Sequence, residues 1–110
     1  MEHEKLTVRK SRVFDRWLGG LNDGDARGRI TARIVRLENG SWGDVRSIGR
    51  GLFELRIDCG PGYRLYGMKR SAVFVVLLCG GDKGSQQRDI ERAVRMARRI
   101  AEGGFYEKPV

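Results

Sequence analysis

The chain of 110 residues contains 22 Lys and Arg against 14 Asp and Glu, which gives it a net charge of +8 and a pI of about 10.2. Its length is typical of one domain, so we expect a single unit over 1–110 with tails at 1–5 and 103–110. Hydrophobic residues make up 40% of the chain, which supports a compact core and excludes wholesale disorder.

Membrane, secreted and metal-binding classes are disfavoured by the sequence. The longest apolar run, 72–79, is too short for a membrane span, and the polar first residues contain no secretory signal. We therefore predict a cytoplasmic protein with no membrane partner. The cysteines Cys59 and Cys79 form no CxxC pair and can make at most one bridge, which a reducing cytosol disfavours. The only histidine, His3, lies in a predicted tail, so we expect no zinc site, no histidine-activated nucleophile and no cofactor.

The first half of the chain predicts one short strand and two helices. The expected elements are a strand over 6–9, a helix from the N-cap Ser11 to a break at Gly19 and Gly20, and a helix from about Asp23 or Asp25 to Asn39 and Gly40. Each helix has one apolar face, so the two should form a hairpin with one apolar side. The other face of the second helix carries four arginines: Arg27, Arg29, Arg33 and Arg36.

The second half of the chain has the period of strands. The expected elements are strands over 45–48, 52–58, 63–68 and 72–79, then a helix that starts at the N-cap Ser85. A turn at 59–62 joins the second and third of these strands. The order β-α-α-β-β-β-β-α predicts an α+β protein, with a helical hairpin packed on a small, mainly antiparallel sheet and a C-terminal helix.

The hairpin around that turn gives the first functional prediction. Its expected core-facing residues are Phe53, Leu55, Ile57, Tyr63 and Leu65. This pairing sets Arg56 directly across from Arg64 on the solvent face. Two opposed arginines repel each other unless an anion lies between them, so the pair predicts an anion site. The alternative is a self-neutralised cluster, because Glu54 lies two residues along the same face.

The excess positive charge is mostly arginine, with 17 Arg against five Lys. A guanidinium group presents a planar fork that suits phosphate, so the charge favours binding to a polyanion over a general role in solubility. The further residues that we expect to contact RNA are Arg50, Arg33, Arg36 and Arg88.

Four short motifs follow one another in a specific order. They are Gly49-Arg50-Gly51, Glu54-Leu55-Arg56-Ile57, Gly62-Tyr63-Arg64 and Gly80-Gly81-Asp82-Lys83. Together they resemble the addiction-module killer proteins of the RelE/ParE toxin superfamily, in particular its HigB-like, phage-related branch. The likeness covers roughly 6–102 and implies the fold predicted above. It also implies a toxin of a type II toxin–antitoxin system, with a small helix-turn-helix antitoxin encoded nearby as its partner.

The resemblance implies an activity as well, the cleavage of mRNA in the ribosomal A site. By position, Arg56 and Arg64 match the two strand positions that hold basic catalytic residues, and Lys83 matches a basic position after the last strand. Glu54 stands where the best-known relatives have lysine, and Tyr106 lies too far along the chain to match the C-terminal tyrosine of some relatives.

A mechanism can be written with these residues and without a metal. Attack by the ribose 2′-OH needs a base, stabilisation of the phosphate charge and a donor to the 5′-oxygen. Arginine stays protonated, so Arg56 and Arg64 would stabilise charge. Glu54 is then the candidate base, and Lys83 the candidate acid or phosphate clamp.

Three functions remain open at this stage. The first is a ribosome-dependent mRNA endonuclease that inhibits translation. The second is a non-enzymatic inhibitor of DNA gyrase, as in the ParE-like half of the superfamily, and the third is a non-catalytic module that binds nucleic acid. The opposed Arg56 and Arg64 favour RNA cleavage, because the gyrase inhibitors share the fold but lack the basic cluster.

Overall fold

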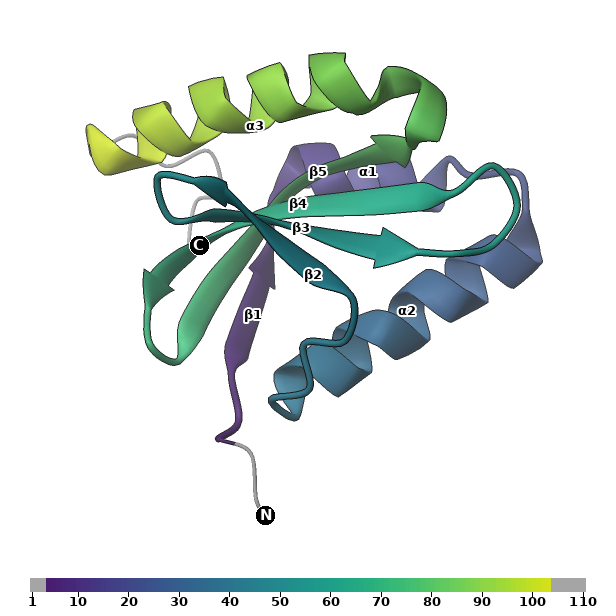
Figure 1. Cartoon of the computed structure of the whole chain (residues 1–110), viewed down its shortest axis with the longest axis horizontal. Coiled ribbons are helices and arrows are strands. Elements are labelled where there is room, and N and C mark those ends of the chain that lie inside the picture. The colour runs from purple at the N-terminus through teal and green to yellow at the C-terminus, as the bar shows by residue number, and fades with distance from the viewer. Residues whose placement is uncertain (1–3, 104–110) are drawn as a thin grey trace.

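The computed structural model describes residues 4–103. It is a five-stranded sheet with helices on both faces (Figure 1). The strands are β1 (Thr7–Lys10), β2 (Val45–Gly49), β3 (Leu52–Ile57), β4 (Tyr63–Ser71) and β5 (Phe74–Asp82). The helices are α1 (Arg12–Gly19), α2 (Gly24–Glu38) and α3 (Gln86–Ala101), with a one-turn 3-10 helix, η1 (Lys83–Ser85), before α3. Most of the two expected tails lies outside the described residues, as do His3 and Tyr106.

The strands lie in the order β1-β5-β4-β3-β2, with β1 parallel to β5 and every other pair antiparallel. The predicted α+β class and the predicted order of elements are therefore confirmed. The bounds of the last two strands differ from the prediction: β4 extends to Ser71, the next two residues form the turn into β5, and β5 runs from Phe74 to Asp82 and not over 72–79. A continuous apolar run cannot reveal this turn, because the hairpin places it inside the run.

Side-chain caps fix the starts of the first two helices as expected. The Ser11 hydroxyl accepts a hydrogen bond from the Phe14 amide and donates one to the Leu78 carbonyl at 2.6 Å, so it also ties α1 to β5. Asp23 accepts a hydrogen bond from the Ala26 amide at the start of α2. Ser85 is the N-cap residue of α3 as expected, but its side chain makes no capping hydrogen bond, because its hydroxyl donates to the Asp89 carboxylate.

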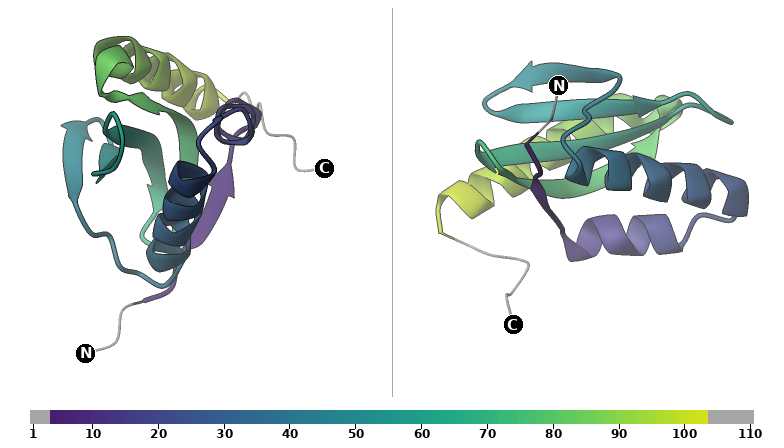
Figure 2. Two further views of the ribbon diagram at one scale, coloured as in Figure 1. Left: turned by 90° about the vertical axis from the view of Figure 1, so that its right-hand side faces the viewer. Right: turned by 90° about the horizontal axis from the view of Figure 1, so that it is seen from below.

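The sheet separates two apolar cores (Figure 2). The core under α1 and α2 consists of Phe14, Ala26, Ile30, Ile34, Leu37, Phe53, Leu55, Ile57, Tyr63, Leu65, Val75 and Leu77. The core under α3 consists of Leu52, Tyr66, Met68, Val76, Leu78, Cys79, Ala93, Met96 and Ile100. Neighbouring residues of β3 alternate between the two faces of the sheet, as the pleat of a strand requires: Phe53, Leu55 and Ile57 lie in the core under α1 and α2, and Leu52 in the core under α3.

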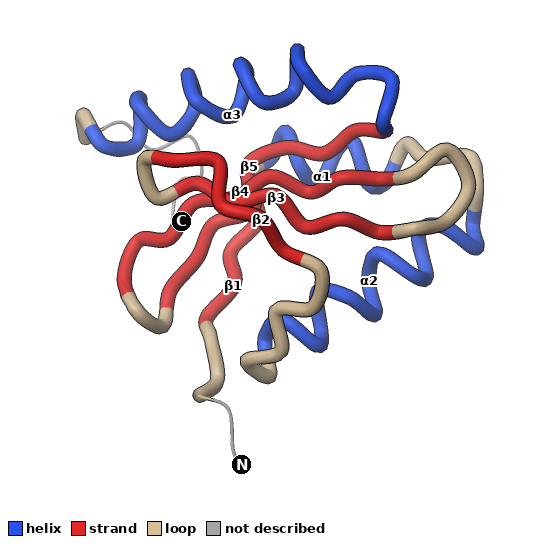
Figure 3. The backbone as a smooth tube through the Cα atoms, in the orientation of Figure 1, coloured by secondary structure: helices blue, strands red, loops and turns tan. Residues whose placement is uncertain are grey.

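The turn between β3 and β4 and the connection from β5 to α3 lie at the same end of the sheet (Figure 3). Between 4 and 103, no helix is long and apolar enough to cross a membrane.

Candidate anion-binding site

The predicted register of the β3–β4 hairpin is confirmed. Arg56 pairs with Arg64 across the two strands, flanked by the pairs that the apolar residues of the hairpin make on either side. The two arginines lie on the face that α1 and α2 leave uncovered. The sequence suggested that this face is open to solvent. In the structure α3 covers the neighbouring part of the face, and Gln86 reaches Glu54.

A cleft of about 320 Å³ opens beside the two arginines at this end of the sheet. Its lining residues are Asp44, Arg56, Asp58, Gly60, Pro61, Gly62, Arg64 and Lys83. Lys83 comes from η1 and lies close to Arg64, with Gly62 beside both side chains. A Cβ on Gly62 would lie 3.7 Å from the Lys83 Cβ and 3.9 Å from the Arg64 Nη1. The cleft is thus lined by the three basic residues that were predicted to be catalytic: Arg56, Arg64 and Lys83.

Two carboxylates in the cleft, Asp44 and Asp58, were given no site role by the sequence analysis. The Arg56 Nε lies 3.6 Å from the Asp44 Oδ1, so this pair is an ion pair at the mouth of the cleft. Asp58 is exposed and makes no ion pair within the described part of the chain. Only its position directly after a strand that carries Arg56 could have drawn attention to it.

The expected solvent exposure of Glu54 is wrong, because its side chain is fully buried. It accepts hydrogen bonds from the Arg46 Nε at 3.1 Å, the Tyr66 hydroxyl at 3.0 Å and the Gln86 Nε2 at 2.9 Å. Burial by itself raises the pKa of Glu54, but these three hydrogen bonds outweigh it and lower the pKa below its usual value. A buried carboxylate with a lowered pKa is a poor general base, so the structure favours another role for Glu54.

Arg56 and Arg64 lie on either side of this carboxylate. The Arg56 Nε is 3.9 Å from the Glu54 Oε1, and the Arg64 Nε is 3.8 Å from the Glu54 Oε2. Both Nε atoms are buried, and neither has a hydrogen-bond partner among residues 4–103. A buried N–H group without a partner costs free energy as long as no acceptor is bound to it.

The expected exposure of Arg33 on α2 is wrong, and this burial is an observation against the RNA contact predicted for it. Its side chain is buried, and its guanidinium donates hydrogen bonds to the carbonyl groups of Arg56, Trp42 and Asp44. Desolvation by burial, followed by the nearby Arg36, lowers the pKa of Arg33. The spacing contained a signal for this: Arg33 is three residues after the buried Ile30 and four before the buried Leu37.

The other predicted RNA contacts, Arg36, Arg50 and Arg88, are exposed but do not line the cleft. Arg50 lies at the tip of the β2–β3 hairpin with a φ of 59° and borders a hollow against the end of α3. The structure adds Arg46 on β2, which sequence reasoning missed because its link to the site is a side-chain contact with Glu54 across the two strands.

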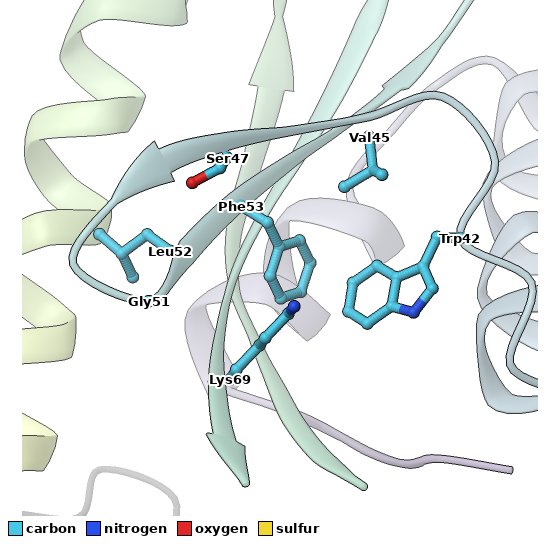
Figure 4. A pocket seen from close by; sticks show the side chains of 7 residues that line it. All are labelled: Trp42, Val45, Ser47, Gly51, Leu52, Phe53 and Lys69. Carbon is cyan, nitrogen blue, oxygen red and sulfur yellow. The ribbon is translucent and has the colours of Figure 1, made fainter. Parts of the chain in front are cut away.

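A second hollow, of about 410 Å³, lies on the other side of β3 (Figure 4). Its lining residues are Trp42, Val45, Ser47, Gly51, Leu52, Phe53 and Lys69. Trp42 packs edge to face on Phe53, with 5.0 Å between ring centroids, and the Lys69 Nζ lies 5.0 Å from the Trp42 ring. Lys69 is the only charged side chain among the lining residues, so this hollow lacks the opposed charges of the cleft.

No group of three His, Cys, Asp or Glu side chains that could hold a metal ion occurs among the described residues. Cys59 and Cys79 are both free thiols, and burial raises the pKa of Cys79 to about 12.

Comparison with known proteins identifies relatives of the chain but not its activity. No family model matches the sequence. A protein of Haemophilus influenzae, which carries the description "Uncharacterized protein", is 44% identical to it over 95 residues. The match covers 86% of this chain and 96% of the Haemophilus protein. The chain belongs to the same family as that protein.

Proposed function

We propose that this protein is an endoribonuclease that cleaves mRNA on the ribosome, and that it is the toxin of a type II toxin–antitoxin pair with the RelE/ParE topology. The observation that supports this most is the cleft where Arg56, Arg64 and Lys83 meet. The order of the elements and the mixed sheet agree with the fold that the resemblance implies.

The residues of the cleft supply the charge that phosphate cleavage needs. Arg56 and Arg64 stabilise the negative charge that develops on the phosphate oxygens, because guanidinium groups bind such oxygens with paired hydrogen bonds. Lys83, which borders the cleft beside Gly62 and Arg64, donates to the 5′-oxygen or holds the neighbouring phosphate.

The proton of the attacking 2′-OH needs an acceptor other than Glu54, which is buried and fully hydrogen-bonded. Asp44 and Asp58 are the two carboxylates that line the cleft. Asp44 is already paired with Arg56, whereas Asp58 is exposed and makes no ion pair with another described residue. Asp58 is therefore the residue that we assign as proton acceptor.

An RNA-binding protein without catalysis is the second candidate. The observation in its favour is the burial of Glu54, since the carboxylate at the strand position nearest the arginines cannot act as a base. The two candidates differ in what the cleft does to the phosphate once it is bound. DNA gyrase inhibition does not need the arginine pair and is the outcome to exclude.

The proposed toxin needs a partner that keeps it inactive, and charge indicates the kind of surface it would present. A net charge of +8 favours an antitoxin with acidic and apolar side chains, because complementary charge speeds association. The resemblance points to a small helix-turn-helix protein encoded nearby. Expression of the toxin alone should arrest growth, and expression together with this partner should restore it.

The test compares Arg56→Ala with Arg16→Ala after induced expression in a host cell, with primer extension on total mRNA. Arg16 is the matched control, since it is an exposed arginine on α1 that lies outside the cleft and is not among the predicted RNA contacts. We expect discrete breaks on translated messages with the wild-type protein and with Arg16→Ala, and a loss of about a hundredfold or more with Arg56→Ala. Weakened RNA binding without any breaks would favour the non-catalytic candidate. Double-strand DNA breaks with intact messages would contradict both.

A further inference from the structure

Glu54 lies where side chains from three strands and one helix meet. Arg46 reaches it from β2, Arg64 and Tyr66 from β4, and Gln86 from α3, while Arg56 lies beside it on β3. We propose that Glu54 is a positioning residue that holds Arg56 and Arg64 side by side as a preformed clamp for one phosphate group. That the phosphate belongs to RNA rests on the proposed function; the clamp itself does not.

The first argument is the repulsion that Glu54 offsets. Arg56 and Arg64 are direct partners in the β3–β4 register, so their positive charges lie on adjacent strands of one face. Without an anion between them, each side chain would swing away into solvent. The carboxylate supplies that anion nearly symmetrically, with one oxygen 3.9 Å from the Arg56 Nε and the other 3.8 Å from the Arg64 Nε.

The second argument is that Glu54 does not use up the two arginines. Its hydrogen bonds come from Arg46, Tyr66 and Gln86, whereas the Nε atoms of Arg56 and Arg64 stay beyond hydrogen-bond distance. Three guanidinium groups against two carboxylates, Glu54 and the Asp44 that pairs with Arg56, leave a net charge of +1. The cluster thus keeps positive charge and unpaired N–H groups for a further anion.

The guanidinium group of Arg64 extends from Glu54 to the edge of the cleft. The Arg64 Nε faces Glu54, while its Nη1 lies by Gly62, at the edge of the cleft that Lys83 also borders. Only 14% of the Arg64 side chain is exposed, and Glu54 is the carboxylate that its Nε faces. Because the guanidinium is already oriented, little conformational entropy is lost when a phosphate binds.

The first experiment measures sulfate binding to the purified full-length protein by NMR of the arginine Nε–H signals. Sulfate is a tetrahedral dianion whose charge is constant over the pH range used. The variants are Glu54→Gln and, as matched control, Glu91→Gln, which makes the same change at an exposed position on α3. In the wild-type protein and in the control, the Arg56 and Arg64 signals should shift together and saturate at the same sulfate concentration.

For Glu54→Gln the proposal and simple electrostatics predict opposite signs. Removal of a negative charge alone would tighten sulfate binding. We expect binding to weaken by about fivefold or more, because the two forks are no longer held together. Sulfate binding by Glu54→Gln that equals or exceeds the wild-type level would overturn the proposal.

The second experiment uses RNA cleavage, with Glu54→Gln and Arg56→Ala alone and combined. We expect Glu54→Gln to lower the turnover rate about ten- to a hundredfold while KM changes less than about threefold, because orientation matters most in the transition state. The double variant should be no worse than Arg56→Ala by more than about threefold, since the residues act as one unit. Fully multiplicative losses would contradict the positioning role. A wild-type protein that cleaves no RNA would refute the proposed function and leave the sulfate result to decide on the clamp.

Tyr66→Phe provides a second test in case Glu54→Gln does not fold. The groups that face Glu54 are Arg46, Arg56, Arg64, Tyr66 and Gln86, and the variant removes only the Tyr66 hydroxyl. The ionised carboxylate is lost as pH falls through its pKa, and loss of a donor raises that pKa. Sulfate binding should therefore fail at a pH about half a unit or more above the wild-type value. Coincident pH profiles would count against a clamp that depends on ionised Glu54.

Discussion

The two faces of β3 are made by alternate residues of one strand, yet only one of them is apolar throughout. On β3, Phe53, Leu55 and Ile57 all pack under α1 and α2. On the other face, Leu52 packs under α3, but the next residues of that face are Glu54 and Arg56. The change from apolar to charged coincides with the point where α3 begins, since Gln86, its first residue, bonds Glu54.

This difference shows that the pleat assigns residues to a face, whereas the covering helix decides what the face becomes. Under α3 the residues of this face form a core. Where the strands extend past the start of α3, the same row of positions lines a charged cleft. The junction, at Glu54, has properties of both regions, because it is fully buried and also carries a charge. The predictions below test the closed face first, then the boundary, then the open cleft.

The largest expected effect on stability is on the closed face. Leu65 is fully buried and pairs with Leu55 in the centre of the core under α1 and α2. Leu65→Ala should lower the free energy of unfolding by about 2–5 kcal/mol, through lost burial and the cavity that remains. Urea denaturation monitored by circular dichroism measures this. Arg56→Ala, on the open part of the sheet, should change it by less than about 1 kcal/mol.

Equal destabilisation by both variants would remove the distinction between a packed face and an open one. A second variant on the closed face is needed because the core around Leu65 could collapse into the cavity and reduce the loss of stability. Gly80→Ala introduces a Cβ that would lie 2.3 Å from the Trp17 ring, so it should destabilise the protein as well.

The element order and the β3–β4 register could be predicted because they depend on local alternation and on one strong turn signal. The apolar residues of the hairpin fix its register to steps of two residues, and with the short turn at 59–62 the predicted pairing sets Arg56 across from Arg64, as observed. The end of β4 could not be predicted, since Ala72 and Val73 are apolar residues in a turn. Hydrophobicity reports burial and carries no direct information on a two-residue hairpin turn.

The site was predictable where it depended on strand register and not where it depended on the packing of helices. Arg56 and Arg64 follow from the hairpin, and the resemblance added Lys83. The burial of Glu54 depends on where α3 starts, and the burial of Arg33 depends on the carbonyl groups of the loop before β2 and of β3. The spacing of Arg33 between Ile30 and Leu37 indicates that it is buried, but spacing reveals neither the carbonyl groups that bind Arg33 nor the helix start that buries Glu54.

Arg33 provides the next prediction, at the boundary between core and surface. Arg33→Met keeps the length of the side chain but removes the donors to three carbonyl groups. We expect a loss of about 1–3 kcal/mol in the free energy of unfolding, because those carbonyl groups lose their partners. Arg36→Met is the matched control on the exposed side of α2 and should stay within about 0.5 kcal/mol of wild type.

Thermal unfolding of the two variants and their RNA binding separate the roles further. A destabilised Arg33→Met protein that, once folded, binds RNA as the wild type does would confirm a purely structural arginine. Equal stability of both variants, with weaker RNA binding by Arg33→Met, would restore Arg33 to the RNA contacts and contradict its burial.

The smallest expected effect on stability is at the mouth of the cleft. Asp44 forms an ion pair with Arg56 at 3.6 Å, and 61% of its side chain is exposed. Such a pair contributes little, so Asp44→Asn should change the free energy of unfolding by less than about 0.5 kcal/mol. It also removes a negative charge that competes with phosphate for Arg56. We expect sulfate and RNA to bind about two- to fivefold more tightly at low salt, with the gain disappearing as added salt screens the charges.

Because Asp58 is the proposed proton acceptor, cleavage by Asp44→Asn should persist, whereas cleavage by Asp58→Asn should fall about a hundredfold or more. Loss of cleavage in Asp44→Asn alone would move the proton acceptor from the free carboxylate to the paired one.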